Sequence, residues 1–178
     1  MELYDRRHNT VHYSFRIKEA ILSELEKERS EKGVSTGSLL NEILDSYINQ
    51  FMHFKHLGFV PVPKDFLRKW IPKINEKDLV KDAKELGSVI AREYISYIFQ
   101  VVNNETLVEF LDMWLSRLGQ HQHKIKDRIH WYAVNHDINM QFSTHLKVFL
   151  SSLIESVTMK PVKFIEVTPH VVTFSFEV

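Results

Sequence analysis

The chain has 178 residues, which is enough for one ordinary domain or two small ones. Its 23 basic and 23 acidic residues cancel, so any attraction to nucleic acid or to a membrane needs a local patch of charge. The sequence contains no cysteine, which excludes disulfides, thiolate zinc sites, iron–sulfur clusters and cysteine nucleophiles.

The opening sequence, MELYDRRHNT, lacks the apolar core of a secretory signal. No stretch of the chain approaches the roughly 20 apolar residues that a membrane-spanning helix needs. We therefore expect a compact cytoplasmic protein that has no association with a membrane.

The segment VHYSFRI, residues 11–17, alternates between apolar and polar side chains, as a half-buried strand does. One face carries Val11, Tyr13, Phe15 and Ile17, and the other carries His12, Ser14 and Arg16. A lone strand leaves its backbone groups without partners, and no second strand is predicted nearby. A homodimer in which the strands of two chains pair antiparallel would satisfy them.

Two helices follow this strand. Residues 18–32 have helical apolar spacing, and Gly33 suits the left-handed position that ends a helix. Ser35 is a good N-cap for a second helix. The apolar face of that helix carries Leu39, Leu40, Ile43, Leu44, Tyr47, Ile48 and Phe51.

The segment KHLGFVPVP, residues 55–63, interrupts the helical pattern with one glycine and two prolines. It predicts two domains, residues 1–56 and residues 57–178. In the second domain, apolar spacing predicts helices over residues 64–71, 78–102 and 106–118. A strand near residues 129–133, a helix over 141–157 and a hairpin of strands 162–168 and 171–178 follow. The expected fold class is α+β, with three helices and then a β-α-β-β order.

The first domain resembles the ribbon-helix-helix family of DNA-binding regulators, of the CopG, Arc and MetJ type. The resemblance covers about residues 11–51. It rests on YSFRI, on the Gly33-x-Ser35 turn, on the spacing of apolar residues in both helices and on the strand-helix-turn-helix order. It implies a homodimer, or a dimer of dimers, that inserts a two-stranded ribbon into the major groove of double-stranded DNA.

The resemblance also implies a role for individual residues. The outward side chains of the ribbon, His12, Ser14 and Arg16, would read base edges, and Arg16 can donate two hydrogen bonds to a guanine. The resemblance implies that Ser35, Thr36 and Gly37, at the start of the second helix, bind phosphates. Arg6 and Arg7 would contact phosphates or the minor groove.

The second domain is expected to add oligomerisation and, as an open alternative, binding of a small-molecule effector. His121, His123, His136 and Asp137 are of types that ligate zinc, nickel or copper. Solvated loop positions for the first two, and a turn or capping role for the others, explain the same pattern more simply. We expect no resident cofactor, with a metal ion or effector left open.

No nucleotide-binding loop, nucleophile elbow or zinc-protease motif is present, so we do not expect an enzyme. The expected function is a homodimeric, sequence-specific transcription regulator. The alternative is a protein-interaction module resembling an antitoxin, in which the first domain serves mainly to pair chains.

Overall fold

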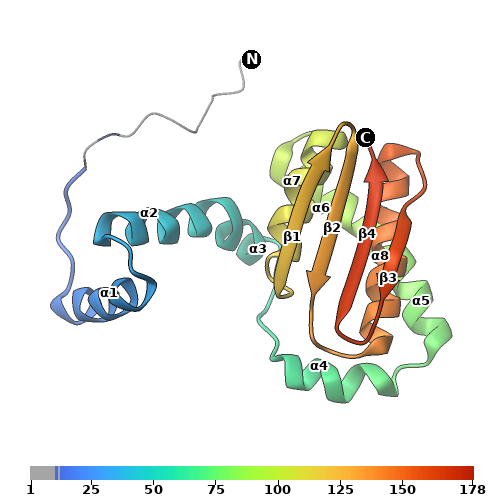
Figure 1. Cartoon of the computed structure of the whole chain (residues 1–178), viewed down its shortest axis with the longest axis horizontal. Helices are drawn as coiled ribbons and strands as arrows, with labels where there is room; N and C mark the ends of the chain where they lie inside the picture. Colours follow the sequence, from blue (N-terminus) through green and yellow to red (C-terminus); the bar gives the residue numbers. More distant parts are fainter. Residues whose placement is uncertain (1–10, 12) are drawn as a thin grey trace. The chain divides into compact units, whose positions relative to one another are not determined.

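The computed structural model describes residue 11 and residues 13–178. The chain divides into two compact units between Ile48 and Asn49 (Figure 1). This division comes earlier than the boundary expected after residue 56, because Phe54 is buried in the core of the second unit.

The first unit contains helices α1 (Glu19–Lys32) and α2 (Thr36–Ser46). Gly33 has a φ of 67°, and its left-handed conformation ends α1 as predicted. The side chain of Ser35 accepts a hydrogen bond from the Ser38 N–H and caps α2, again as predicted. The described residues among 11–17 form no strand within this single chain, so the ribbon between two chains stays a prediction.

The helical part of the second unit follows the predicted segments closely. A π-helical turn, η1 (Tyr47–Phe51), connects α2 to the short helix α3 (Met52–His56). The remaining helical elements before the sheet are α4 (Lys64–Trp70), η2 (Ile71–Lys73), α5 (Glu76–Glu85), η3 (Leu86–Ile90), α6 (Ala91–Phe99) and α7 (Asn104–Leu115). The helices expected at 64–71, 78–102 and 106–118 are thereby confirmed, the second with a π-helical turn in its middle.

A four-stranded antiparallel sheet completes the fold. Its elements are β1 (Gln120–Lys126), β2 (Ile129–Asn135), α8 (Met140–Thr158), β3 (Lys163–Val167) and β4 (Val171–Glu177). The strand order across the sheet is β1-β2-β4-β3. The predicted β-α-β-β order is therefore wrong in one respect, because β1 precedes it and pairs with β2 along its whole length.

The missed strand has the sequence QHQHKIK, in which Ile125 is the only aliphatic residue. Its β-structure comes from the hairpin it forms with β2, whose turn contains Asp127 in the left-handed region, at φ 57°. Local sequence carries little β-propensity here, and pairing with a neighbouring strand decides the conformation.

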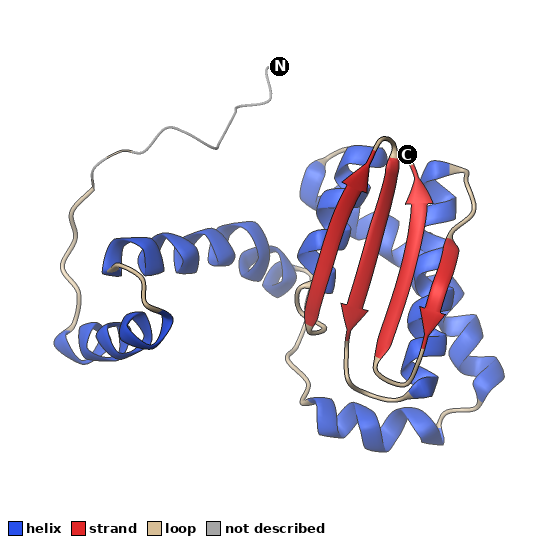
Figure 2. Cartoon of the chain, in the orientation of Figure 1, coloured by secondary structure: helices blue, strands red, loops and turns tan. Residues whose placement is uncertain are grey.

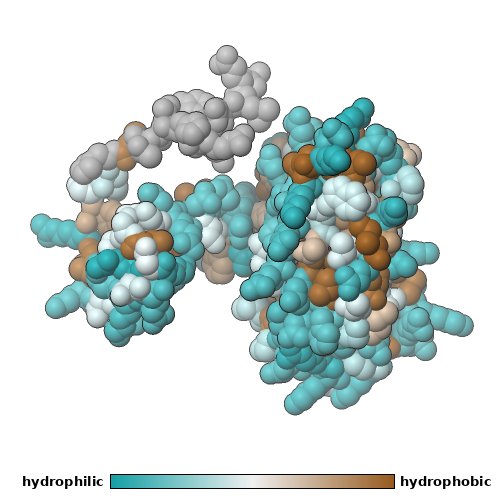
Figure 3. Space-filling model, in the orientation of Figure 1, coloured by the Kyte–Doolittle hydropathy of each residue, from teal (hydrophilic) through white to brown (hydrophobic). Residues whose placement is uncertain are grey.

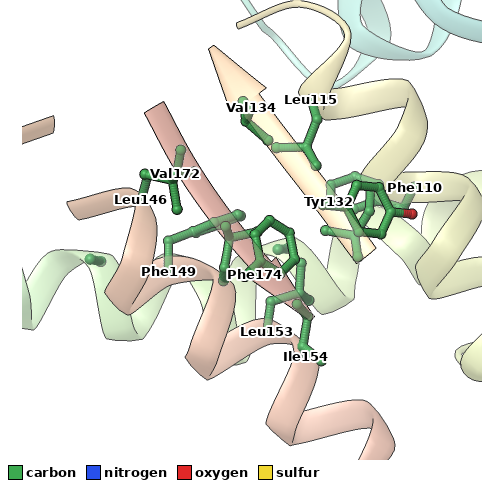
Figure 4. Packing of buried hydrophobic residues seen from close by; sticks show 14 of the residues in the cluster. Phe110, Leu115, Tyr132, Val134, Leu146, Phe149, Leu153, Ile154, Val172 and Phe174 are labelled. Atoms are coloured by element: carbon green, nitrogen blue, oxygen red, sulfur yellow. The ribbon is translucent and has the colours of Figure 1, made fainter. Parts of the chain in front are cut away.

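In the second unit, helices α5, α6, α7 and α8 lie on one face of the sheet (Figure 2). Alternate residues of β2 and β4 point to that face and are buried, among them Tyr132, Val134 and Phe174. Figure 4 shows them together with Leu115 of α7 and Leu153 of α8. Burial of apolar area between helices and sheet is the main stabilising contribution to this unit. Among the described residues, no helix combines the length and the apolar composition needed to span a membrane.

Candidate functional site

The predicted base-reading residues are described only in part. Ser14 and Arg16 are exposed in the single chain, as side chains that contact DNA need to be. His12, Arg6 and Arg7 lie outside the described residues.

The predicted phosphate-binding residues lie together at the start of α2, and they differ in what their groups already contact. The Ser35 hydroxyl is used in capping the Ser38 N–H, at 3.0 Å. The Thr36 hydroxyl donates to the carboxylate of Glu26 at 3.0 Å, so it is not free to meet a phosphate. Gly37 is exposed, and the first N–H groups of a helix have no partner within it. Backbone N–H groups of Thr36 and Gly37 are thus the better candidates for binding phosphate than the two hydroxyls.

Three of the five acidic residues of α1 form ion pairs with basic residues of the same helix. The pairs are Glu24 with Lys27, Glu26 with Arg29, and Lys32 with both Glu28 and Glu42. The hydrogen bonds from Arg29 and Thr36 lower the pKa of the Glu26 carboxyl, which keeps it ionised. Arg16 has no ion pair with another described residue.

The first unit leaves an unusual amount of apolar surface uncovered. Its described residues bury only two side chains, Leu25 and Leu39. Nine large apolar side chains are each at least 39% exposed: Val11, Tyr13, Phe15, Ile21, Leu22, Ile43, Leu44, Tyr47 and Ile48. We call these nine residues the apolar face of the first unit; Figure 3 shows part of the unit's surface coloured by hydropathy. Exposed apolar surface of this extent is typical of interaction sites.

The second unit contains a cluster of histidines that links α7 to the first two strands. His121 and His123 both face α7 from β1, and His123 Nδ1 lies 3.1 Å from Asp112 Oδ2. His123 Nε2 lies 2.9 Å from Nδ1 of His130 on β2. His121 Nε2 is 3.8 Å from the second oxygen of Asp112. The expectation that His121 and His123 are solvated loop residues is therefore wrong, because they lie on a strand and contact a helix.

This histidine cluster continues into the aromatic core of the sheet. The ring of His123 stacks on Tyr132 at a centroid distance of 4.1 Å, and His130 stacks on Phe176 at 5.4 Å. Burial lowers the pKa of His130, and the nearby His123 lowers it further. Burial raises the pKa of the Tyr132 phenol, and the negative charge of Asp112 raises it further.

The other two candidate metal ligands have different partners. His136 is fully buried, accepts a hydrogen bond from the Ile138 N–H at Nδ1 and contacts Ser143 Oγ at 2.9 Å through Nε2. Asp137 has a φ of 51° and pairs with Arg68 and His170. The turn role considered for this pair agrees with these contacts, since both nitrogens of His136 are already used.

No group of three or more His, Asp or Glu side chains in the described part of the chain is arranged to hold a metal ion. Asp112 and His130 were not singled out from the sequence. The strand was predicted from the alternation of Ile129, Trp131 and Ala133, whereas the buried face of β2 carries His130, Tyr132 and Val134. No sequence pattern indicated a role for Asp112, because a single acidic residue in an otherwise apolar helix is equally compatible with a solvated position.

Comparison with protein-family models, with curated proteins and with solved structures found no match for this chain. Its function has to be inferred from its own residues and their geometry.

Proposed function

We propose that the protein is a homodimeric DNA-binding transcription regulator whose first unit is a ribbon-helix-helix module. The observation that carries this proposal is the apolar face of the first unit, together with the strand-like alternation that precedes α1. The second unit would contribute to oligomerisation and to the binding of an effector.

The apolar face supports pairing with a second copy of the chain. Its residues come from the segment before α1, from α1, from α2 and from η1, so a partner that covers the face would contact all four. In a two-fold dimer, the segments containing Tyr13 and Phe15 would pair as antiparallel strands and turn these rings toward the helices. The same pairing supplies the backbone hydrogen bonds that a single chain cannot make.

The charge arrangement supports DNA as the ligand of this dimer. When Tyr13 and Phe15 turn inward, the alternation of a strand turns Ser14 and Arg16 outward. Three of the five acids of α1 pair with Lys27, Arg29 and Lys32, and these three therefore repel phosphate less than free carboxylates would. A two-stranded ribbon fits the major groove, where Arg can recognise guanine by two hydrogen bonds.

Replacing Leu44 with glutamate is expected to raise the dissociation constant of the dimer at least about 100-fold, because an unpaired carboxylate buried at an interface costs several kcal/mol. Sedimentation equilibrium of the full chain would measure it. Ser46→Glu is the matched control, since Ser46 lies on the opposite side of α2 and should leave the dimer intact. A Leu44→Glu protein that dimerises like the unmodified chain would contradict pairing through the apolar face.

The DNA site would be found by selecting a randomised duplex library on the purified protein at about 0.1 M salt, which partly screens nonspecific contacts. A palindromic motif would support a symmetric reader, and the spacing of its half-sites would report the dimer geometry. No enrichment, together with a second protein that co-purifies at constant stoichiometry, would instead support the interaction module resembling an antitoxin.

For the selected site, Arg16→Ala is expected to weaken binding by about 1–3 kcal/mol and to relax the preference at one base pair. A fluorescence anisotropy titration against the selected duplex and its single-base variants would measure both effects. Arg128→Ala is the control, because Arg128 belongs to the hairpin of the second unit. If the alanine variant at position 16 bound its best site as tightly as the unmodified chain, the assignment of the reading face would be wrong.

A further inference from the structure

The helices of the second unit leave one face of its sheet uncovered. Along β2, the side chains of His130, Tyr132 and Val134 point toward the helices and are buried. Ile129 and Trp131 alternate with them and therefore point to the other side. We call this side the open face of the sheet; Figure 3 shows it from outside, with apolar side chains among hydrophilic ones.

Trp131 is a large aromatic side chain on an inner strand of the open face. It is 41% exposed, and its ring has no aromatic or cationic contact with another described residue. The other two tryptophans differ, because Trp70 stacks on Phe66 and Trp114 packs against Phe149. The ring of Trp131 is therefore accessible to a planar group of a ligand.

Lysines of the edge strand β1 lie beside the apolar residues of β2 on this face. In the register of the two strands, Lys124 is opposite Trp131 and Lys126 is opposite Ile129. Residues opposite each other share a face of the sheet, with Cβ atoms about 4.5–5.5 Å apart. Both lysines are exposed, and neither has an ion pair with another described residue. Lys163 of β3 lies in the same row as Trp131, two strands away on its other side.

The acidic residues of the open face leave the surroundings of Trp131 positively charged. Glu177 is paired with Lys160 at 2.9 Å, so its charge is compensated within the protein. Glu166 lies on β3, the edge strand farthest from β1. The row next to Trp131 carries the uncharged polar side chains of Gln122 and Thr173, which can hydrogen-bond to a ligand.

A partner for this face has to offer a planar group to Trp131 and negative charge to the lysines beside it. A second copy of the chain fits poorly, because it would bury lysines without opposite charges, and charged residues are depleted in the cores of interfaces. Duplex DNA offers phosphates but keeps its bases stacked inside the helix. A single strand offers both phosphates and unpaired bases that stack on aromatic side chains.

The spacing of the side chains fits a strand of nucleic acid that follows β1. Lys124 and Lys126 are two residues apart, which separates them by about 7 Å along the edge of the sheet. Phosphates bound there would place their bases over β2, where Trp131 lies. We propose that the open face of the sheet binds single-stranded nucleic acid, with phosphates at Lys124 and Lys126 and a base stacked on Trp131.

This binding is separate from the recognition of duplex DNA proposed for the first unit, and the two can fail independently. Arg16→Ala should leave the affinity for a single strand unchanged. Trp131→Ala should likewise leave the affinity for the selected duplex unchanged.

The test is a fluorescence anisotropy titration of the full chain against a labelled oligo(dT) of about 12 nucleotides, a length within the range of known single-strand sites. Trp131→Ala should weaken binding by a factor between about 5 and about 150, the cost of losing one stacked base. Trp131→Phe keeps an aromatic ring and should lose much less. Trp70→Ala, at an exposed tryptophan of α4, is the matched control and should change nothing.

Three outcomes would overturn the proposal. The first is a Trp131→Ala chain that binds the oligonucleotide as tightly as the unmodified chain. The second is equal binding of a polyphosphate, since charge alone would then account for the affinity. The third is a Trp131→Ala chain that sediments as a smaller species, because the open face would then pair two copies of the chain.

Salt dependence tests the role of the two lysines. The double variant Lys124→Gln/Lys126→Gln should reduce the slope of log affinity against log salt concentration by about 1.4, at about 0.7 for each phosphate of a single strand. Lys77→Gln/Lys81→Gln, which changes two exposed lysines of α5, is the matched control and should keep the slope. An unchanged slope in the first double variant would show that β1 does not bind the phosphates.

Discussion

Replacing Gly87 with alanine is expected to destabilise the second unit by about 3 kcal/mol, near the upper end of what overpacking costs. Gly87 is buried in η3, where that helical turn crosses α8. A Cβ at this position would lie 2.4 Å from the Phe149 carbonyl oxygen and 2.9 Å from the Ser152 Cβ. Two of its three close neighbours are backbone atoms of α8, which cannot move aside as a flexible side chain can.

Urea unfolding monitored by tryptophan fluorescence would measure this loss, because all three tryptophans belong to the second unit. Ser88→Ala is the matched control, since it adds no atom and removes only the hydroxyl that donates to the Lys84 carbonyl. We expect the control to change the free energy of unfolding by less than about 1 kcal/mol. An alanine at position 87 that left the unfolding midpoint unchanged would mean that η3 and α8 are not packed as closely as described.

The stability of the second unit is expected to fall by about 3 kcal/mol as the pH drops from about 6.5 to about 4, through His136 alone. Burial lowers the pKa of His136 to about 4, from an ordinary value of 6.5. The unfolded chain therefore takes up a proton in this window and the folded chain does not. The stabilising contribution is complete above pH 6.5 and is lost as the pH falls toward the folded pKa.

Hydrogen bonding gives the physical reason for this low pKa beyond burial. Nδ1 of His136 accepts from the Ile138 N–H, so a proton there would oppose another proton. Nε2 donates to Ser143 Oγ, which itself donates to the Thr168 carbonyl. The neutral imidazole of His136 thus makes a hydrogen bond at each ring nitrogen. In the charged form, the proton on Nδ1 would face the Ile138 N–H, so that two donors would oppose each other.

Urea unfolding at pH 7 and at pH 5 would isolate this contribution when the unmodified chain is compared with His136→Asn. An asparagine keeps an acceptor for Ile138 and cannot titrate, so the loss of stability between the two pH values should become smaller. His56→Asn, a change at an exposed histidine of α3, should preserve the original dependence. If His136→Asn showed the same dependence as the unmodified chain, His136 would not be the group responsible.

The helices of the second unit could be predicted from the sequence, because the apolar residues of each helix recur at helical spacing and mark the side that becomes buried. In α8, apolar residues such as Leu146, Leu150 and Leu153 recur at helical spacing, and all three are buried against the sheet. The turn between α1 and α2 was predictable for a different reason. Gly33 and Ser35 have conformational and capping preferences that act locally.

The strand β1 could not be predicted in the same way. Gln120–Lys126 has no apolar alternation, and its conformation depends on a hairpin partner that only the folded chain provides. The same pairing brings His123 opposite Tyr132, next to His130, and turns it toward Asp112. Residues that are separate motifs in the sequence thus become one hydrogen-bonded cluster.

The sequence by itself determined most of the helices of the second unit, the turn between α1 and α2, and the α+β class of the fold. These properties depend on the conformational preferences of single residues and on the spacing of apolar residues along the chain, and neither requires a contact with a distant segment. Only the tertiary structure decided which polar side chains meet at the inner face of the sheet, because strand pairing and helix packing join residues that spacing along the chain does not relate.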